Sequence, residues 1–162
     1  MLHPIHELTY TILLVDDDPD HLALCARWLE GSGYPVDTAA SGAEALACLE
    51  RENFDMVLMD CQMPVMDGIT AAEKIGKKIA APIVLLTGST EPETIERARD
   101  AGVSNYSLKP FNADQLRVAV ELAIHRFIEI SNLKEENAKL KKLLAEEILI
   151  NDALKDVVEK KW

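Results

Sequence analysis

Acidic, hydroxyl and amino side chains follow four apolar segments of this 162-residue chain. Asp16 and Asp17 follow the first such segment, Asp60 follows another, Thr87 ends a third, and Lys109 stands directly after a fourth. Carboxylates held close together repel one another unless a cation neutralises them. Mg²⁺ takes oxygen ligands and keeps several waters, so it needs only one or two protein carboxylates. The three aspartates therefore predict a Mg²⁺ site, provided that the fold brings them together.

The same five side chains are suited to phosphoryl transfer. A carboxylate can attack a phosphoryl group and form an aspartyl phosphate, while a metal ion and a lysine ammonium offset charge on the transferring oxygens. We therefore predict that Asp60 is the acceptor, that Lys109 stabilises the phosphoryl group and that Thr87 hydrogen-bonds to it. The set has no histidine base, no catalytic cysteine pair and no glycine-rich phosphate loop.

Five short apolar segments are expected to position these residues. They are bounded by acidic or turn residues, which is typical of strands buried on both faces of a parallel sheet. The expected strands are Thr11–Val15, Val36–Ala39, Met56–Met59, Ile83–Thr87 and Asn105–Leu108. In such sheets the site lies at the carboxyl ends of the strands, near the point where the strand order reverses.

Five amphipathic segments alternate with the strands and carry helix start signals. Ser41 with Glu44, and Asn112 with Gln115, form capping boxes. The expected helices begin near Pro19, Ser41, Gly68, Pro92 and Asn112. The alternation predicts an α/β fold with a doubly wound, five-stranded parallel sheet.

Four segments of the chain resemble the motifs of the response-regulator receiver family. They are Ile12–Pro19, Met59–Gly68, Pro82–Gly88 and Tyr106–Phe111. The resemblance covers about residues 9–128 and implies a flavodoxin-like receiver in a two-component phosphorelay. It also implies a phosphorylation switch rather than an enzyme, with only self-phosphoryl transfer and autodephosphorylation expected.

The resemblance assigns a metal site to four residues of this chain. It implies that Asp17 and Asp60 bind Mg²⁺ directly, that Asp16 acts through water, and that the Gln62 backbone carbonyl completes the protein ligands. Asp60 would receive its phosphoryl group from a sensor histidine kinase or a phosphotransfer protein.

Three further residues have roles in the switch that the resemblance implies. Lys109 would pair with the phosphoryl oxygens, Thr87 would move toward the phosphate, and Tyr106 would rotate into the vacated space. The bond before Pro110 is expected to be cis, a form that is uncommon enough to matter structurally.

Other polar residues are better explained by structure than by chemistry. Asp67 precedes Gly68 at a helix start and is expected to act as a turn or cap residue. Cys61 adjoins the acceptor and is interpreted as a packing thiol. The four histidines have no metal-ligand spacing and are expected at the surface: His3, His6, His21 and His125.

Composition limits the class of protein. The net charge of −11 argues against a nucleic-acid surface, which needs clustered Lys and Arg. No stretch approaches the roughly 18–20 uninterrupted apolar residues of a membrane span, and Met1–Thr11 has no signal-peptide pattern. The odd number of cysteines favours reduced thiols over a disulfide framework: Cys25, Cys48 and Cys61. We therefore expect a cytoplasmic protein.

The chain after about Glu121 predicts one long helix that ends as a coiled coil. With Ile130 at heptad position a, six of the nine a and d residues through Val158 are apolar. An Asn at position a, as at Asn137, is typical of a two-stranded parallel register. The expected seam of a homodimer is Ile130, Leu133, Asn137, Leu140 and Leu144. The domains are then an N-terminal tail (1–8), a receiver (9–128) and a helical coiled-coil tail (129–162).

The output of the tail leaves several alternatives open. It is interpreted as an interaction segment for an unknown downstream protein, but a helix folded back on its own receiver is also compatible with the pattern. The layout through Lys142 is similar to antiterminator-type (ANTAR) response regulators, so a truncated RNA-binding antiterminator is the alternative function. Leu140–Trp162 is weakly similar to the end of small insertion-sequence transposase subunits. A phosphatase of the haloacid type would need an acid where Gln62 stands.

Overall fold

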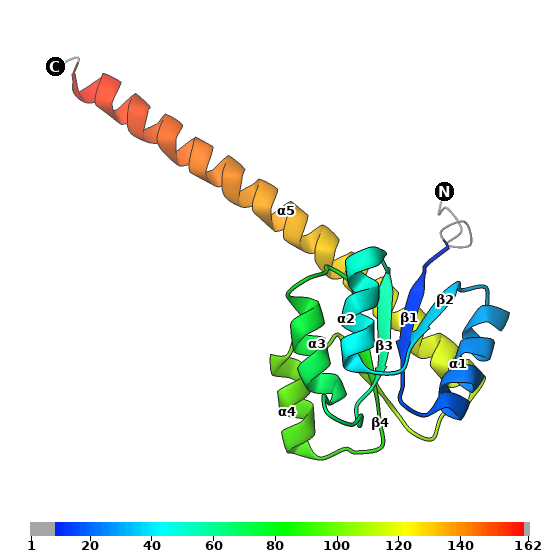
Figure 1. Ribbon diagram of the computed structural model, residues 1–162. Coiled ribbons are helices and arrows are strands. Elements are labelled where there is room, and N and C mark those ends of the chain that lie inside the picture. Colours follow the sequence, from blue (N-terminus) through cyan, green and yellow to red (C-terminus); the bar gives the residue numbers. More distant parts are fainter. Residues whose placement is uncertain (1–8, 161–162) are drawn as a thin grey trace. The chain divides into compact units, whose positions relative to one another are not determined.

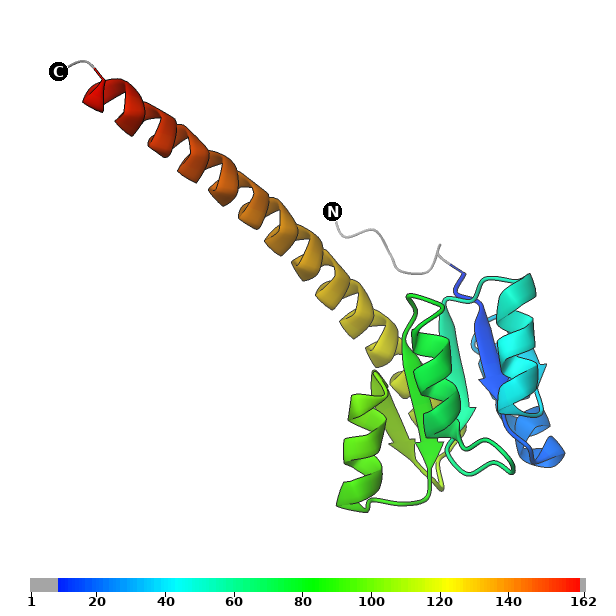
Figure 2. The ribbon, with the colours of Figure 1, turned by 60° about the vertical axis from the view of Figure 1, so that its left-hand side comes forward.

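Five parallel strands form one sheet in the order β2-β1-β3-β4-β5 (Figures 1 and 2). The computed structural model describes residues 9–160. The strands are β1 (Ile12–Val15), β2 (Val36–Ala39), β3 (Met56–Asp60), β4 (Ile83–Thr87) and β5 (Asn105–Leu108). The helices are α1 (Pro19–Gly31), α2 (Gly42–Arg51), α3 (Gly68–Gly76), α4 (Pro92–Asp100) and α5 (Ala113–Glu159). The predicted fold class and its long C-terminal helix are confirmed.

Alternate residues of the central strands pack into two cores, one on each face of the sheet. On one face, Leu13 and Val57 belong to a cluster with residues of α2, α3 and α4. On the other face, Ile12 and Leu58 pack with residues of α1 and α5. Burial on both faces is the reason that these strands are apolar along their whole length.

The strand order reverses between β1 and β3, and this places the polar residues together. Val15 is in register with Met59, so that Asp16 and Asp60 end neighbouring strands at the same level. Thr87 is in register with Leu108, which brings Lys109 beside the end of β4. A switch point of this kind is where doubly wound sheets bind their ligands.

The predicted capping residues begin both helices, and the bonds are reciprocal at Asn112, whereas Glu44 bonds the residue before its cap. The Glu44 backbone N–H donates to Ser41 Oγ at 3.1 Å, and Glu44 Oε2 accepts from the backbone N–H of Ala40 at 2.9 Å. Asn112 and Gln115 bond reciprocally, at 2.8 and 3.0 Å. These bonds satisfy N–H groups that the first turn of a helix leaves without partners.

Helix α5 belongs to two units, because the chain divides after Phe127. Its first turns are part of the receiver core, where Leu116 and Val120 are completely buried. From residue 132 to residue 160 every side chain is exposed, and α5 continues without interruption to Glu159. Among residues 9–160, no helix is both long and apolar enough to span a bilayer.

Candidate functional site

Three carboxylates meet where β1 and β3 end. One oxygen atom from each of Asp16, Asp17 and Asp60 lies within 4.8 Å of the others, and within residues 9–160 no second group of this kind occurs. Asp16 and Asp60 are 2% and 6% exposed, whereas Asp17 is exposed. Oxygen donors at this spacing suit a hard divalent cation such as Mg²⁺. The structure therefore brings together all three aspartates that the sequence predicted as ligands.

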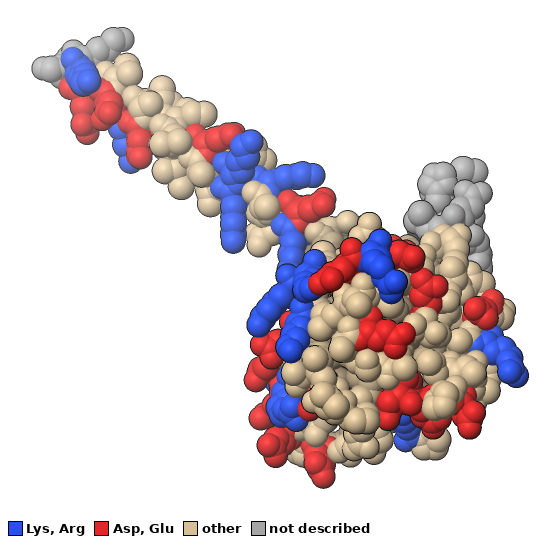
Figure 3. All heavy atoms as spheres, viewed as in Figure 1, with Lys and Arg blue, Asp and Glu red and all other residues tan. Residues whose placement is uncertain are grey.

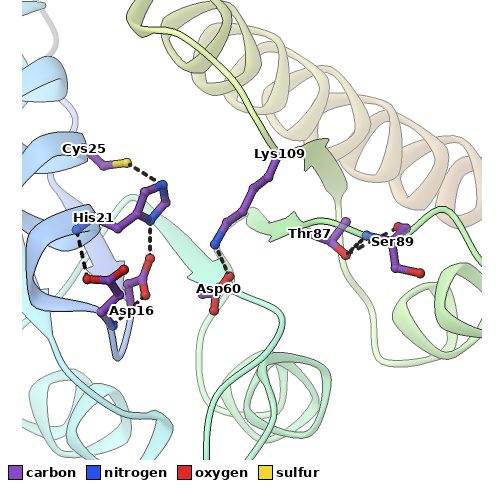
Figure 4. A network of polar contacts seen from close by, with 8 residues as sticks. Asp16, His21, Cys25, Asp60, Thr87, Ser89 and Lys109 are labelled. Atoms are coloured by element: carbon purple, nitrogen blue, oxygen red, sulfur yellow. Dashed lines mark hydrogen bonds and ion pairs between the residues drawn. The ribbon is translucent and has the colours of Figure 1, made fainter.

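Lys109 reaches this cluster from the loop after β5. Its ammonium Nζ donates to Asp60 Oδ1 at 2.6 Å (Figure 4). The backbone N–H of Lys109 donates to the Thr87 carbonyl at 2.8 Å, and the Lys109–Pro110 bond is cis, as expected. One lysine thus faces three carboxylates, which leaves two negative charges without a partner, and a single Mg²⁺ would neutralise both.

Burial is the main cause of a raised pKa at the Asp60 carboxyl. The charges of Asp16 and Asp17 also raise it, while the hydrogen bond and charge of Lys109 oppose the shift. A cation bound among the carboxylates would favour the ionised form. Positive charge near Asp60 therefore favours the ionised carboxylate, which is its nucleophilic form.

The Thr87 and Tyr106 side chains do not hydrogen-bond to Asp60. Thr87 is 6% exposed, and its hydroxyl accepts from the Ser89 N–H at 3.1 Å and donates to the Ser89 carbonyl at 3.4 Å (Figure 4). Tyr106 is 41% exposed. Thr87 ends β4 and Tyr106 lies within the neighbouring β5, and the Thr87 hydroxyl is bonded within its own loop.

The loop after β3 is fixed against Asp60 by a close backbone approach. Gly68 N–H donates to the Cys61 carbonyl at 2.8 Å, and a Cβ at Gly68 would lie 2.2 Å from the Asp60 carbonyl oxygen. Only glycine allows the start of α3 to come this near. Gln62, whose carbonyl the resemblance implies as a metal ligand, is exposed in this loop, and Val65 has a positive φ of 68°.

Asp67 caps α3, as predicted, by accepting from the Thr70 N–H at 2.7 Å. It also accepts from Arg97 Nη2 of α4 at 3.1 Å. Partial burial of Asp67 raises its pKa, but the bonds from Thr70 and Arg97 outweigh this and leave the pKa lowered. The ion pair closes one side of a cleft of about 620 Å³ that Cys61 and Thr87 also line.

His21 departs from the sequence-based expectation. It was expected at the surface, but its side chain is only 24% exposed and its Nδ1 is bonded to Asp16 Oδ2. Its Nε2 lies 3.6 Å from Cys25 Sγ, one helical turn further along α1. The prediction was wrong because β1 and the start of α1 fold toward each other, which spacing alone does not reveal. His125 is exposed, as expected, and His3 and His6 lie outside the described residues.

Burial also governs the thiols near the site. It is the largest cause of a raised pKa at Cys61, whose hydrogen bond with Thr87 acts in the opposite direction. Cys61 is 7% exposed and belongs to the core cluster on the α2–α4 face. These contacts agree with the interpretation of Cys61 as a packing residue.

Comparison with known proteins identifies the family. The profile of the response regulator receiver domain matches residues 12–121. The chain is 41% identical over 143 residues to the transcriptional regulatory protein PdtaR of Mycobacterium tuberculosis, covering 88% of this chain and 70% of PdtaR. It is 34% identical over 120 residues to the transcriptional regulatory protein ResD of Bacillus subtilis, covering 74% and 50% of the two chains.

Solved structures agree with this assignment. The chemotaxis response regulator CheY4 of Vibrio cholerae has a TM-score of 0.67 and 31% identity, covering 72% of this chain and 99% of CheY4. The receiver domain of the sensor histidine kinase PA1611 from Pseudomonas aeruginosa has a TM-score of 0.66 and 32% identity, covering 73% and 99%. That structure holds a magnesium ion coordinated in its active-site cleft.

The similarity to PdtaR also extends into the tail. Its alignment of 143 residues is longer than the family match at 12–121, and the segment before residue 12 is too short to account for the difference. Part of α5 beyond residue 121 is therefore shared with this relative. The chain, with its acidic cluster, its lysine and its sheet order, belongs to the response regulator receiver family of two-component systems.

Proposed function

We propose that Asp60 is the phosphoryl acceptor of this receiver and that a sensor histidine kinase or a phosphotransfer protein is the donor. The observation that carries the proposal is the bond of 2.6 Å from Lys109 Nζ to Asp60 Oδ1, inside a cluster of three carboxylates. The transfer forms a bond between phosphorus and an Asp60 oxygen and breaks the bond from phosphorus to the donor's imidazole nitrogen. No further enzymatic activity than this transfer and hydrolysis of the aspartyl phosphate is proposed.

Asp16, Asp17, Asp60 and the Gln62 carbonyl would hold Mg²⁺. The ion would supply positive charge that stabilises the transferring oxygens. Lys109 already contacts the oxygen that is to be phosphorylated or its partner oxygen, so its ammonium needs only a small movement to pair with the phosphoryl group. The buried position of Asp60 excludes bulk water from one side of the reacting carboxylate.

Thr87 and Tyr106 would report the phosphorylated state. The Thr87 hydroxyl is bonded to main-chain atoms of Ser89 that it can exchange for a phosphoryl oxygen. Removing that hydroxyl from its loop would change the space beside exposed Tyr106. A local change of charge that biases a surface between two arrangements is the general way in which phosphorylation switches act.

The test of the acceptor uses a phosphoryl mimic. We expect beryllofluoride to bind the full-length chain in a Mg²⁺-dependent manner, as measured by fluorine NMR, and Asp60→Asn to abolish the bound signal. Asp100→Asn is the matched control, because Asp100 is exposed at the end of α4. Binding that persists undiminished in Asp60→Asn would refute the acceptor assignment.

The segment 129–162 is proposed as a two-stranded parallel coiled coil that makes the protein a cytoplasmic homodimer. Its apolar seam residues are exposed over about half of their surface, with Leu133 at 57% and Leu140 at 58%. Asn137 lies between them, and Glu136 with Lys141 provides a g-to-e ion pair across two chains. The receiver then comprises residues 9–128, and the phosphorylated dimer acts on another protein.

A second candidate function is RNA binding of the antiterminator type. The observation that favours it is the alignment to a transcriptional regulatory protein, which includes part of α5. Figure 3 shows Lys and Arg side chains gathered along one stretch of the tail helix. The net charge of −11 opposes this function. Retention of the chain on immobilised RNA at moderate salt would support it, and we expect none.

A further inference from the structure

Asp16 has a hydrogen-bond partner at each of its two carboxylate oxygens (Figure 4). Its Oδ1 accepts from the backbone N–H of Asp18 at 2.9 Å. Its Oδ2 is bonded to His21 Nδ1. Asp16 is 2% exposed, so these two groups are its main hydrogen-bond partners within the chain. The orientation of this carboxylate therefore depends on one main-chain group and one side chain.

His21 is itself held by three neighbours. Its backbone N–H donates to Asp18 Oδ1 at 3.3 Å within the cap of α1. Its Nε2 lies 3.6 Å from Cys25 Sγ, and its ring is 5.7 Å from the ring of Phe111, in the loop that also carries Lys109. Phe111 in turn packs against Trp28 at 6.4 Å. The imidazole thus has little freedom to turn away from Asp16.

The two ring nitrogens of His21 have different neighbours, Asp16 at Nδ1 and Cys25 at Nε2. Cys25 is completely buried, and burial, followed by the charge of Asp16, raises the pKa of its thiol to about 11. Its Sγ lies near Nε2, the imidazole nitrogen that does not face Asp16. Because a carboxylate oxygen accepts, the Nδ1–H group of His21 donates to Asp16 Oδ2.

We propose that His21 is a positioning residue for Mg²⁺: it orients the Asp16 carboxylate, through the Nδ1–H to Oδ2 bond, toward the ion that Asp17 and Asp60 also hold. The inference rests on the proposed metal site of these three aspartates. Carboxylates near a metal are commonly held by hydrogen bonds from outer residues, and loss of such a partner typically weakens metal binding by about 10–100-fold. His21 is not proposed as a ligand, because it does not belong to the group of converging oxygen atoms.

Calorimetric titration of the full-length, metal-free chain with MgCl₂ tests the inference. We expect His21→Leu to raise the Kd for Mg²⁺ about 10-fold or more, because Asp16 loses its donor. His21→Asn places an amide N–H near the position of Nδ1 and should return the Kd to within about threefold of the original value. His21→Gln extends its amide further and should bind as weakly as the leucine variant. The matched control is His125→Leu, since His125 is exposed on α5.

The outcomes separate this inference from the proposed function. If the original chain binds Mg²⁺ and Asp17→Asn prevents binding, but His21→Leu and His21→Gln bind as the original does, the positioning role is refuted and the metal site stands. If the original chain does not bind Mg²⁺, the proposed metal site itself fails. Should His21→Leu not fold, as judged by circular dichroism in EDTA, the Asn and Gln variants decide. Equal Kd values for those two variants would overturn the inference.

Discussion

The receiver buries its large apolar residues, whereas the tail exposes residues of the same kind. In the receiver, Leu116 is completely buried, and the buried polar side chains of the site, those of Asp16, Asp60 and Thr87, each have a partner within the chain. In the tail, Leu133 and Leu140 are each more than half exposed, although they recur with a regular period. A helix of alternating apolar and charged residues gains most of its stability from packing against another element. The receiver is therefore complete in one chain, whereas the tail requires a second surface.

The largest effect is expected from charges placed on the predicted seam of the tail. Leu133→Asp with Leu140→Asp should convert the dimer to a monomer of 18.0 kDa, because each seam residue is lost twice per dimer and burying one leucine is worth about 1.5–3 kcal/mol. Light scattering after gel filtration measures the mass. Leu149→Asp, at the outward-facing f position, is the control and should keep the original mass. A monomer in the original chain at micromolar concentration would remove the coiled-coil proposal.

Within the receiver, the largest effect is expected at Gly68. Gly68→Ala would bring a Cβ to 2.2 Å from the Asp60 carbonyl oxygen, so the loop or the strand must shift. We expect a loss of about 3 kcal/mol in the free energy of unfolding, at the upper end of overpacking effects, measured by urea denaturation. Gly31→Ala, where a Cβ meets nothing within 4 Å, is the control and should not destabilise the fold. Equal stability of the two variants would contradict the close approach.

The cap at Asp67 should contribute less, and its effect should depend on pH. Asp67→Ala removes the acceptor for the Thr70 N–H and should cost about 1 kcal/mol. Since the folded state lowers the pKa of Asp67 below 3.8, its contribution is present above that value and is lost as the pH falls through the lowered pKa. Urea denaturation at pH 7 and in steps below pH 4 measures this. If the difference in unfolding free energy between the original chain and Asp67→Ala did not shrink on acidification, the charge of Asp67 would not be involved.

The smallest effect is expected for the ion pair between α4 and the cap of α3. Arg97→Met should cost about 0.5 kcal/mol, because Arg97 and Asp67 are 52% and 38% exposed and exposed pairs are worth little. In an Asp67→Ala background the same change should have no effect, since the partner is already absent. A double-mutant cycle on unfolding free energies measures the coupling. A value above about 1.5 kcal/mol would mean that this pair holds α4 more firmly than surface pairs do.

Much of the receiver could be predicted because the local sequence pattern of its strands and helix caps agrees with their positions in the fold. Apolar segments became strands, and the capping residues Ser41 and Asn112 begin helices as expected. Two strand ends differ by one residue: Thr11 lies outside β1, where its N–H donates to Asp55 Oδ2 at 2.8 Å, and Asp60 continues β3. The carboxylate cluster was predictable because strand ends converge at a switch point.

The remaining contacts depend on the path of the chain in three dimensions. His21 is only five residues from Asp16 and meets it through the turn from β1 into α1, whereas Arg97 meets Asp67 across 30 residues. The close approach at Gly68 follows from the path of a loop, not from its composition. The tail has a regular apolar period, and its assembly is a prediction that the mass in solution tests.

Lys109 and Asp60 are 49 residues apart in the chain, and their bond has a consequence for biosynthesis. The sheet must pair β3, β4 and β5 before the lysine can reach the carboxylate. A nascent chain still on the ribosome, with its β5 segment inside the exit tunnel, has the acceptor aspartate but not the ammonium that assists it. On the proposed function, such a chain is a poor substrate for a kinase, and phosphoryl acceptance marks a domain that has finished folding.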